Sequence, residues 1–438
     1  MVSGPSSRPA EVRPLLTSRG LAVDLILAVL LTHLSLTNFR NYRQLEIDVP
    51  SGTTLIGGEN AQGKTNFLEA IYLLATTRSP RTSSEADFVN WQAAREEENP
   101  ITRVAGQGTG AAGRAEVEIA LTGRPSGRGR RGDEWPDEID DPAGPQLLSV
   151  SKRIRVNGIP RRATDAIGVM PSVFFSTLDM DIICGSPSLR RRFLDLMLSQ
   201  VDRPYLGALT RYARVLQQRN ALLKRIQDGS ASTSELDFWD GEIAKEAAVI
   251  VAGRASAVLA LSAKATEAHH ALASHREKLS LRYQPRLGDG AEATVETTDE
   301  ARARVTAALR AGRPRDCGAG MTLVGPHRDE LAVLVDGASA AAFASRAQQR
   351  SAALALRLGE ANLITGRLGE QPSILLDDVL SELDRRRQEA VMEAISRFSQ
   401  VLVTSAEPER FPGYFRQTAF ELRVEAGVMT TAASGGGE

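Results

Sequence analysis

One short stretch of the chain has the residues and the spacing of a phosphate-binding loop. It matches the pattern G-x-x-x-x-G-K-T, in which glycines let the backbone turn tightly so that successive N–H groups point inward. The positive end of the following helix would also face a phosphate. Lys64 is expected to reach the β- and γ-phosphates, and the hydroxyl of Thr65 to bind Mg²⁺. The predicted nucleotide-binding residues are Gly58, Glu59, Asn60, Ala61, Gln62, Gly63, Lys64, Thr65 and Asn66.

The flanks of this loop help to decide between a nucleotide site and a chance glycine-rich turn. Residues 53–56 are strand-like and residues 66–74 are helix-like, which is the context that a phosphate loop needs. Lys64 is also the only lysine before Lys152, in a chain that uses arginine for nearly all its cations. A compact ammonium suits a point contact with phosphate better than a planar guanidinium does. Both observations favour nucleotide binding.

Two carboxylates end a purely aliphatic run later in the chain. Asp377 and Asp378 follow residues 374–376, which read Ile-Leu-Leu. An acid at the end of such a strand can lie beside the Mg²⁺ held by Thr65, and the next acid can orient or deprotonate the attacking water. We therefore predict Thr65 and Asp377 as the Mg²⁺ site, and Asp377 and Asp378 as the catalytic acids. The alternative for both acids is capping of the helix that follows the strand.

Ser345 opens a helix-like segment shortly before this acidic strand. The order fits the ATP-binding-cassette (ABC) class, in which such a serine of one subunit caps the γ-phosphate bound by the other subunit. Hydroxyl and N–H donors at the positive end of a helix attract a polyanion. ATP would then join two copies of the chain into a two-fold homodimer. The alternative is that Ser345 serves only as the N-cap of its own helix.

The composition is that of an ordinary folded protein, with 42% hydrophobic and 24% charged residues among 438. The net charge of −1 excludes a global positive field, so any DNA contact must come from local basic patches. The two cysteines and five histidines show neither a disulfide framework nor the spacing of a zinc site. We expect a cytoplasmic protein in a reducing compartment, with no membrane partner.

Strand and helix patterns alternate around these motifs. Strand-like segments occur at residues 33–40, 45–49, 115–121, 331–335 and 401–403, and Asn157-Gly158 signals a hairpin. In two long stretches, 188–228 and 235–276, apolar residues instead recur at three- and four-residue steps. We predict an α/β fold, with an ABC-type P-loop ATPase core (a mixed sheet flanked by helices) and an inserted, mainly helical lobe. A helical subdomain without any partner is the plainer interpretation of that lobe.

This pattern divides the chain into an extension, two lobes and a tail. Residues 1–31 are predicted to be a disordered extension or to follow a start codon placed too early. Their apolar run is too short to span a bilayer, and although Arg13 and Arg19 precede it as in a signal peptide, no small-residue cleavage site follows. Residues 32–187 and 319–430 form one discontinuous ATPase lobe, and residues 188–318 the helical lobe. Residues 122–146 are predicted as a mobile surface loop, and residues 431–438 as a disordered tail.

Together these stretches resemble the RecF family of bacterial recombination mediators, which have an ABC-type head similar to that of SMC proteins. The likeness covers about residues 33–405, with every motif in family order. It is carried by residues 36–42 (Leu-Thr-Asn-Phe-Arg-Asn-Tyr), 60–66 (Asn-Ala-Gln-Gly-Lys-Thr-Asn), 185–195 (Gly-Ser-Pro-Ser-Leu-Arg-Arg-Arg-Phe-Leu-Asp), 325–329 (Gly-Pro-His-Arg-Asp), 348–350 (Gln-Gln-Arg) and 376–384 (Leu-Asp-Asp-Val-Leu-Ser-Glu-Leu-Asp).

The resemblance implies a function in recombinational repair, replication and the SOS response to DNA damage. A protein of this family would bind ATP and Mg²⁺, dimerise on ATP, and hydrolyse ATP weakly with stimulation by DNA. It would bind single-stranded DNA, gapped double-stranded DNA and the junctions between them. With the partner mediators RecR and RecO it would help to load the recombinase at gaps. Ser345 would contact ATP in trans, although Ala347 departs from the family, which usually has glycine there.

DNA contact is predicted for three arginines at the start of the helical lobe, Arg190, Arg191 and Arg192, because phosphate contact is one use of such a cluster. Ion pairs within the lobe or to the ATPase core are an equal alternative.

Among other ABC-type proteins, a nuclease would need a C-terminal metal-binding domain, and roughly thirty residues after Thr404 leave no room for one. A transporter subunit would not need the inserted lobe, and a chromosome-organising rod would need far longer heptad repeats. A clamp gated by ATP, in which hydrolysis only resets binding, stays compatible with the recombination role.

Overall fold

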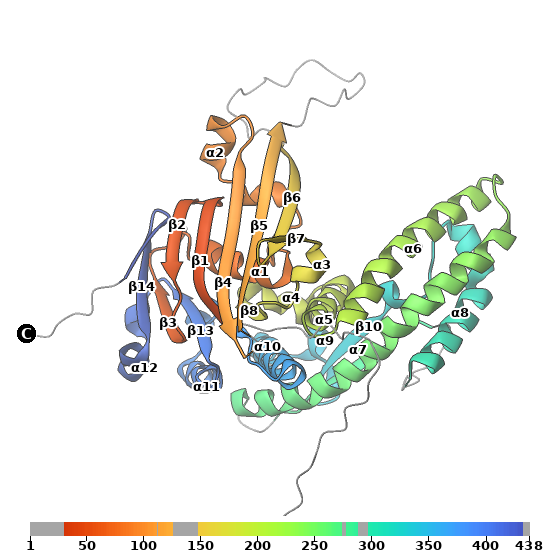
Figure 1. Cartoon of the computed structure of the whole chain (residues 1–438). Helices are drawn as coiled ribbons and strands as arrows, with labels where there is room; N and C mark the ends of the chain where they lie inside the picture. The colour runs from red at the N-terminus through yellow and green to blue at the C-terminus, as the bar shows by residue number, and fades with distance from the viewer. Residues whose placement is uncertain (1–29, 112, 126–147, 274–276, 288–296, 432–438) are drawn as a thin grey trace, which may run out of the picture.

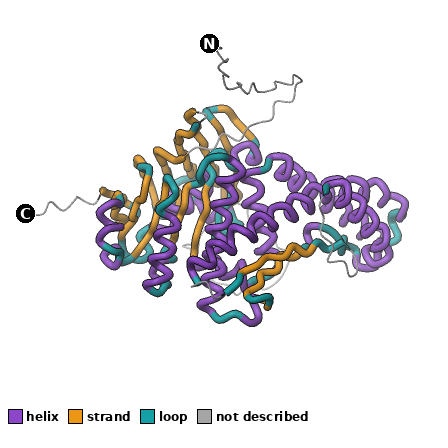
Figure 2. Tube along the Cα trace, turned by 90° about the horizontal axis from the view of Figure 1, so that it is seen from below, coloured by secondary structure: helices purple, strands orange, loops and turns teal. Residues whose placement is uncertain are grey.

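The computed structural model describes residues 30–111, 113–125, 148–273, 277–287 and 297–431. These residues form two neighbouring sheets, and long helices extend away from the sheets to one side (Figures 1 and 2). The predicted extension, the loop at 122–146 and the tail lie largely outside the described residues. Residues 30 and 31 of that extension belong to the first strand.

One sheet is antiparallel, in the order β2-β1-β4-β5-β6-β7. Asn157 and Gly158 join its last two strands with φ values of 52° and 74°, the left-handed conformation that a tight hairpin of this type requires. The hairpin predicted from these two residues is therefore present. The strands are β1 (Leu30–Phe39), β2 (Tyr42–Asp48), β4 (Ile101–Gly110), β5 (Gly113–Pro125), β6 (Leu148–Val156) and β7 (Ile159–Arg161).

The second sheet has the order β15-β14-β3-β13-β12-β8, and the pairs from β14 to β8 are parallel. Parallel strands bring their carboxyl ends to one edge, which is where ligands bind in such sheets. Its strands are β3 (Gly52–Gly57), β8 (Ser172–Ser176), β12 (Ser373–Asp377), β13 (Gln400–Ser405), β14 (Phe420–Glu425) and β15 (Val428–Thr431). This sheet is mixed, because β15 runs antiparallel to β14.

Helix α1 (Lys64–Thr76) lies between the two sheets, in contact with β12 and β8 on one side and with β4 and β5 on the other. Every residue from Phe67 to Thr76 is buried. A helix that is covered all round needs mostly apolar side chains, and this one carries Phe67, Leu68, Ile71, Leu73 and Leu74 within its first eleven residues. Its one buried acid, Glu69, pairs with Arg40 at 2.9 Å. The phosphate loop therefore leads into a helix held rigidly in the core.

The long helices are α5 (Pro187–Val201), α6 (Arg203–Gln227), α7 (Leu236–Leu272) and α8 (Thr298–Ala319). Helices α6 and α8 pack on α7, and α10 (Arg346–Leu368) joins α7 to the rest of the molecule. The continuous stretch predicted over 188–228 is in fact two helices. Asp202 caps α6 by accepting from the Tyr205 N–H, and Pro204 in its first turn cannot donate the hydrogen bond that would continue α5.

A small third sheet has the order β11-β10-β9 and crosses the predicted lobe boundary. Strand β9 (Leu279–Gln284) lies in the predicted helical lobe, but it pairs with β10 (Glu330–Val335), which lies beyond residue 318, and β11 (Ala338–Ser339) follows on the other side of β10. Buried Arg254 of α7 adds a polar link here, since it donates to Asp195 of α5 at 2.9 Å and to Asp329 at 3.2 Å. The division at residues 188 and 318 stays a prediction.

Short elements complete the described chain. They are α2 (Trp91–Glu96), α3 (Ala163–Ala166), α4 (Met180–Cys184), α9 (Ala340–Phe343), α11 (Arg385–Ile395) and α12 (Gly413–Thr418), with 3-10 turns at Glu85–Phe88, Thr177–Asp179, Thr233–Glu235, Pro326–Arg328, Leu380–Glu382 and Pro408–Arg410. By length and composition the segment Thr233–Leu272 could cross a membrane, but 50% of its most apolar window is buried inside the protein, as in the core helix of a folded domain.

Candidate nucleotide-binding site

The predicted phosphate loop connects β3 to α1 and depends on glycine at both of its ends. Gly58 has φ 150°, and a Cβ atom there would lie 2.4 Å from the carbonyl oxygen of Val424. Gly63 has φ 120°, and a Cβ atom there would lie 2.5 Å from Nδ2 of Asn41. Only glycine fits such a conformation at so close an approach. The glycines of the motif are therefore required by the geometry.

Lys64 folds back over the loop that it belongs to. Its Nζ donates to the carbonyl oxygens of Gly58 at 2.5 Å and Glu59 at 2.7 Å. An ammonium has three donors, so one remains after these two bonds. Burial lowers the pKa of Lys64, while the carboxylates of Asp378 and Asp377 act in the opposite direction. The charge thus lies at the loop, where a phosphate would bind.

The β1–β2 hairpin supports the loop from behind. The Tyr42 hydroxyl donates to the carbonyl oxygen of Gly63 at 3.0 Å, and Asn41 Nδ2 donates to that of Gln62 at 2.8 Å. Asn66 in turn donates to Asn41 Oδ1 at 2.8 Å. No role was predicted for Asn41 and Tyr42. The available signal was their place in the 36–42 stretch that carries the family resemblance.

Asp377 meets the phosphate loop through Thr65. The Thr65 hydroxyl donates to Oδ1 of Asp377 at 2.8 Å, and the Thr404 hydroxyl donates to the same oxygen at 3.0 Å. Strand β13 lies between β3 and β12, and its Thr404 is opposite both Ile56 and Asp377 in the register. Burial raises the pKa of Asp377, and the hydrogen bonds from Thr65 and Thr404 oppose that rise. No role was predicted for Thr404, because its function depends on the strand order.

Asp378 has the unusual conformation of φ 52°, which places its carboxylate differently from that of a regular strand residue. Its N–H donates to the Thr404 hydroxyl at 3.0 Å. Its Oδ1 is buried and has no hydrogen-bond partner among the described residues. A buried carboxylate oxygen without a partner is costly unless a ligand or water fills that place. The carboxylate of Asp378 is therefore suited to accept a hydrogen bond from an attacking water.

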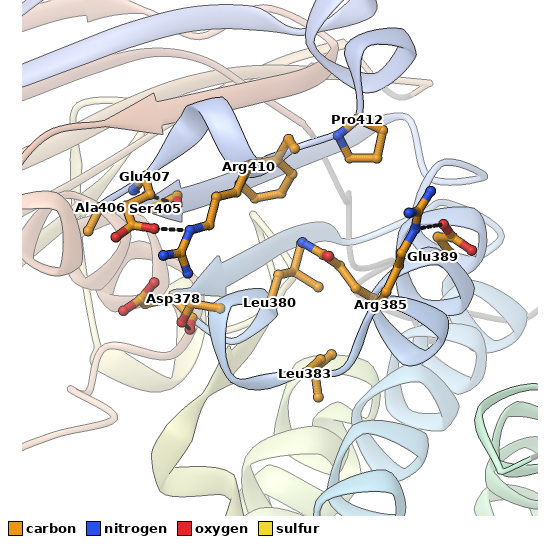
Figure 3. A pocket seen from close by; sticks show the side chains of 13 residues that line it. Asp378, Leu380, Leu383, Arg385, Glu389, Ser405, Ala406, Glu407, Arg410 and Pro412 are labelled. Carbon is orange, nitrogen blue, oxygen red and sulfur yellow. Dashed lines mark hydrogen bonds and ion pairs between the residues drawn. The ribbon is translucent and has the colours of Figure 1, made fainter.

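A cleft of about 620 Å³ opens beside Asp378. Figure 3 shows the guanidinium of Arg410 reaching between Glu407, with which it pairs, and Asp378. On the other side of the cleft Arg385 pairs with Glu389 at 3.0 Å (Figure 3). Asp378 can thus be approached through an opening whose walls carry both charged and apolar side chains.

Ser345 begins α10 and is exposed. Its hydroxyl accepts from the Gln348 N–H at 3.3 Å, and the Gln348 side chain accepts from the Ser345 N–H at 2.7 Å. This reciprocal hydrogen bonding is that of a helix N-cap, the alternative function of Ser345. It leaves the hydroxyl proton free to donate outward, and Ala347 beside it is also exposed. The hydrogen bonds are therefore compatible with either interpretation, and the contact in trans stays a prediction.

Comparison with known proteins shows the family to which this chain belongs. The family described as RecF/RecN/SMC N terminal domain matches residues 30–425. The DNA replication and repair protein RecF of Roseiflexus castenholzii is 37% identical over 410 residues, which cover 92% of this chain and 99% of that protein. RecF of Geobacillus thermodenitrificans is 34% identical over 401 residues, which cover 91% and 98%. The chain belongs to the RecF family of DNA replication and repair proteins.

The RecF fold extends over almost the whole chain. The structure of the recombination mediator protein RecF-ATP in the RecFOR pathway matches with a TM-score of 0.78 and 28% identity, over 94% of this chain and 100% of that one. That of RecF-ATPrS matches with a TM-score of 0.76 and 27% identity, over 93% and 100%. The predicted resemblance and the predicted α/β fold with an ABC-type ATPase core are thus confirmed.

The three arginines predicted to contact DNA all donate to acceptors within the protein. Arg190 pairs with Glu330 at 2.6 Å, which fixes the start of α5 to β10. Arg191 donates to the carbonyl oxygen of Asp329 and Arg192 to that of Ser79, both at 2.8 Å. The Arg190 contact is an ion pair of the kind that the alternative expected, and the other two are hydrogen bonds to the backbone. DNA contact by this cluster stays a prediction.

Proposed function

We propose that the chain is an ATP-dependent DNA-binding protein of recombinational repair and replication. It binds ATP at the phosphate loop, dimerises on ATP, and uses weak, DNA-stimulated hydrolysis as a switch. The observation that supports this best is the meeting of Lys64 and Thr65 with Asp377 and Asp378 at one edge of the parallel sheet. A charged donor, a hydroxyl and two acids in this arrangement are what a nucleotide triphosphate and its metal require.

The residues at this edge fit Mg²⁺. Mg²⁺ is usually bound by one or two protein groups together with phosphate oxygens and water. Thr65 and Asp377 supply such a pair, and within the described part of the chain no cluster of three or more His, Cys, Asp or Glu could hold a metal by itself. When bound, Mg²⁺ would neutralise charge that develops on the phosphates. Thr404 holds Asp377 in place for this purpose.

Asp378 is the group that orients water. Its conformation is fixed by the bond from its N–H to Thr404, and its buried Oδ1 is open to a new donor. A carboxylate in this position can accept a proton or a hydrogen bond from water that attacks a bound γ-phosphate. Hydrolysis then requires that the water be held on the side opposite the leaving group.

Dimerisation depends on Ser345 of a second copy. An exposed serine at the N-terminus of a 23-residue helix presents a hydroxyl, free N–H groups and the positive helix end to an anion. Because this group lies on the surface, it can bind ATP held by another subunit. Two such contacts related by a two-fold axis make ATP the link between protomers.

The biological part of the proposal rests on RecF membership. We infer binding to single-stranded and gapped double-stranded DNA, cooperation with RecR and RecO, and help in loading the recombinase at gaps. The support is the family name, DNA replication and repair protein RecF, and the RecFOR context of the solved relatives. A cytoplasmic location and a function in the SOS response belong to the same inference.

The mass of the protein in solution tests whether ATP joins two copies of the chain. Light scattering on the wild type should give a doubled mass with ATP and Mg²⁺, but not with ADP or without nucleotide. Ser345→Arg should stay monomeric with ATP, because the larger cation would displace the hydroxyl and block close approach. Ala303→Arg, at an exposed position on α8, is the matched control and should dimerise normally. A wild type that stays monomeric with saturating ATP would contradict the proposed sandwich.

A further inference from the structure

A basic groove of about 1070 Å³ lies where the antiparallel sheet meets the long helices. Its walls come from the segment after α1, from β6 and β7, from α3 and from the first half of α6. Figure 1 shows α3 and β7 lying between β6 and the beginning of α6. The groove is thus formed by parts of the chain that are far apart in sequence. It is separate from the cleft beside Asp378.

The charges that line this groove are strongly unequal. Among the described residues that line it, seven are cations and two, Glu85 and Asp165, are acids. Three of the cations have partners inside the protein. Lys152 pairs with Glu85 at 2.8 Å, Arg211 pairs with Glu246 at 2.9 Å, and Arg203 donates to the carbonyl oxygens of Thr164 and Asp165.

The other four cations are Arg78, Arg161, Arg162 and Arg214, and all four are exposed. None of them makes an ion pair with a described residue. They come from three separate parts of the chain, namely the loop after α1, the junction between β7 and α3, and helix α6. They converge on one groove in a chain whose net charge is −1. Positive charge concentrated in this way is an electrostatic footprint for a polyanion.

Helix α6 extends the same surface. Over its 25 residues it carries no Asp or Glu, and its exposed residues include Arg211, Arg214, Lys224 and Arg225. At a rise of about 1.5 Å per residue, the distance from Arg203 to Arg225 is roughly 33 Å. That is close to one turn of B-DNA, about 34 Å. The length suits an extended ligand better than a small anion.

We infer that this groove binds the sugar–phosphate backbone of duplex DNA through Arg78, Arg161, Arg162 and Arg214. The inference rests on the proposed DNA-binding function and names the surface for it. Single strands are commonly held by bases stacked on aromatic rings, and no Phe, Tyr or Trp is among the described residues that line the groove. Cations without aromatic rings favour the duplex portion of a gapped substrate, bound without reading of sequence.

The groove is also connected to the nucleotide site. Arg78 lies in the loop that follows α1, one residue before Ser79, whose hydroxyl donates to Glu69 of α1 at 2.5 Å. Arg81 of the same loop donates to Asn66 at 3.0 Å. A phosphate held by Arg78 therefore acts on a loop that contacts the P-loop helix at two points. This gives bound duplex a direct route to the ATPase site.

Charge reversal tests the groove. The double variant Arg162→Glu/Arg214→Glu is compared with Arg302→Glu/Arg310→Glu, which makes the same change in net charge at two exposed arginines of α8. Binding of a fluorescent duplex and of one of its single strands is measured by anisotropy with ATP and Mg²⁺ at several salt concentrations. The groove variant should lose at least roughly tenfold in duplex affinity, and the slope of log K against log salt should fall by about 0.9 for each lost phosphate contact. The α8 variant should keep the wild-type slope.

The possible results distinguish a wrong assignment of the groove from a wrong proposed function. Equal losses of duplex affinity in the two variants would indicate a general effect of net charge. They would overturn the assignment of duplex binding to the groove. Loss of single-strand binding with duplex binding intact would overturn the duplex assignment. A wild type that binds neither form of DNA would instead overturn the proposed function. The neutral variant Arg162→Gln/Arg214→Gln should lose less affinity than the reversed one, and ATP binding by each variant shows that it is folded.

Discussion

The hydroxyl of Thr65 lies 2.8 Å from Oδ1 of Asp377, although the two residues are 312 positions apart in the chain. Their meeting follows from the order of the parallel strands, since β3, β13 and β12 end together at one edge. The bond holds the start of α1 and the end of β12 in one geometry before any ligand arrives. A site organised in this way loses little entropy when Mg²⁺ and phosphate bind.

Replacement of Lys64 by methionine should abolish nucleotide binding. Methionine has similar length but no charge, and hydrogen bonds to charged groups contribute about 1.5–3 kcal/mol each, so loss of the phosphate contacts predicts an affinity loss of at least about a hundredfold. Fluorescent ATP titration measures it. Lys245→Met, at an exposed position on α7, should bind ATP normally. Normal ATP affinity in Lys64→Met would falsify the assignment of the phosphate loop.

Thr404→Val should separate binding from turnover. Valine keeps the shape but removes both the donor to Asp377 and the acceptor for the Asp378 N–H. We expect turnover to fall by roughly tenfold or more with a smaller change in ATP affinity, and stability to fall by about 1–3 kcal/mol because a buried N–H loses its partner. Steady-state kinetics and urea unfolding measure the two effects. Thr404→Ser keeps the hydroxyl and should restore most of the turnover; a serine variant as slow as the valine one would point to packing instead.

The prediction of the phosphate loop rests on information that is local in the sequence. Gly58, Gly63, Lys64 and Thr65 lie within eight positions, and their chemistry follows from their spacing. The contacts of Thr404 with Asp377 and Asp378 could not be predicted in this way. It depends on β13 being placed between β3 and β12, which is set by pairing between distant strands. The support that the β1–β2 hairpin gives to the loop is non-local for the same reason.

The helical part shows a different limit of sequence analysis. Apolar periodicity continues through residues 188–228, so it does not reveal the break between α5 and α6. The signal was Asp202 followed by Pro204, which is local chemistry rather than periodicity. Strand β9 was not predicted either, because its six residues are too few for alternation to stand out beside long helices. Its partner β10 supplies the pairing that makes it a strand.

Asp378→Asn should bind ATP and then remain in the ATP-bound state. The amide can still occupy the site but is a poor proton acceptor, and loss of general-base assistance typically costs about 10²–10⁴-fold. Light scattering should show a dimer that persists after wild-type protein has returned to monomer. Asp181→Asn, at an exposed position on α4, is the control and should behave as the wild type. Unchanged turnover in Asp378→Asn would remove Asp378 from the catalytic step.

His269→Leu should make the stability of the protein less dependent on pH. His269 is fully buried near the end of α7, and burial lowers its pKa, while Glu277 and Asp336 oppose this and His270 adds to it. In the unfolded chain the pKa is the ordinary value of about 6.5, so between that value and the lower folded one the unfolded state binds more protons. The free energy of unfolding of the wild type therefore falls as the pH is lowered through this window.

Leucine cannot take up a proton, so the variant should lack this part of the acid destabilisation. Urea unfolding of both proteins at pH 7.5 and 5.5 measures the difference, and each unit of pKa shift corresponds to about 1.4 kcal/mol. His33 serves as a control of opposite sign, because hydrogen bonds to Asp48 and Glu46 raise its pKa. In His33→Gln the stabilisation that is present at low pH and lost as the pH rises should disappear, which steepens the acid destabilisation relative to the wild type. If His269→Leu and the wild type lost equal stability between the two pH values, the lowered pKa of His269 would not contribute to the pH dependence of stability.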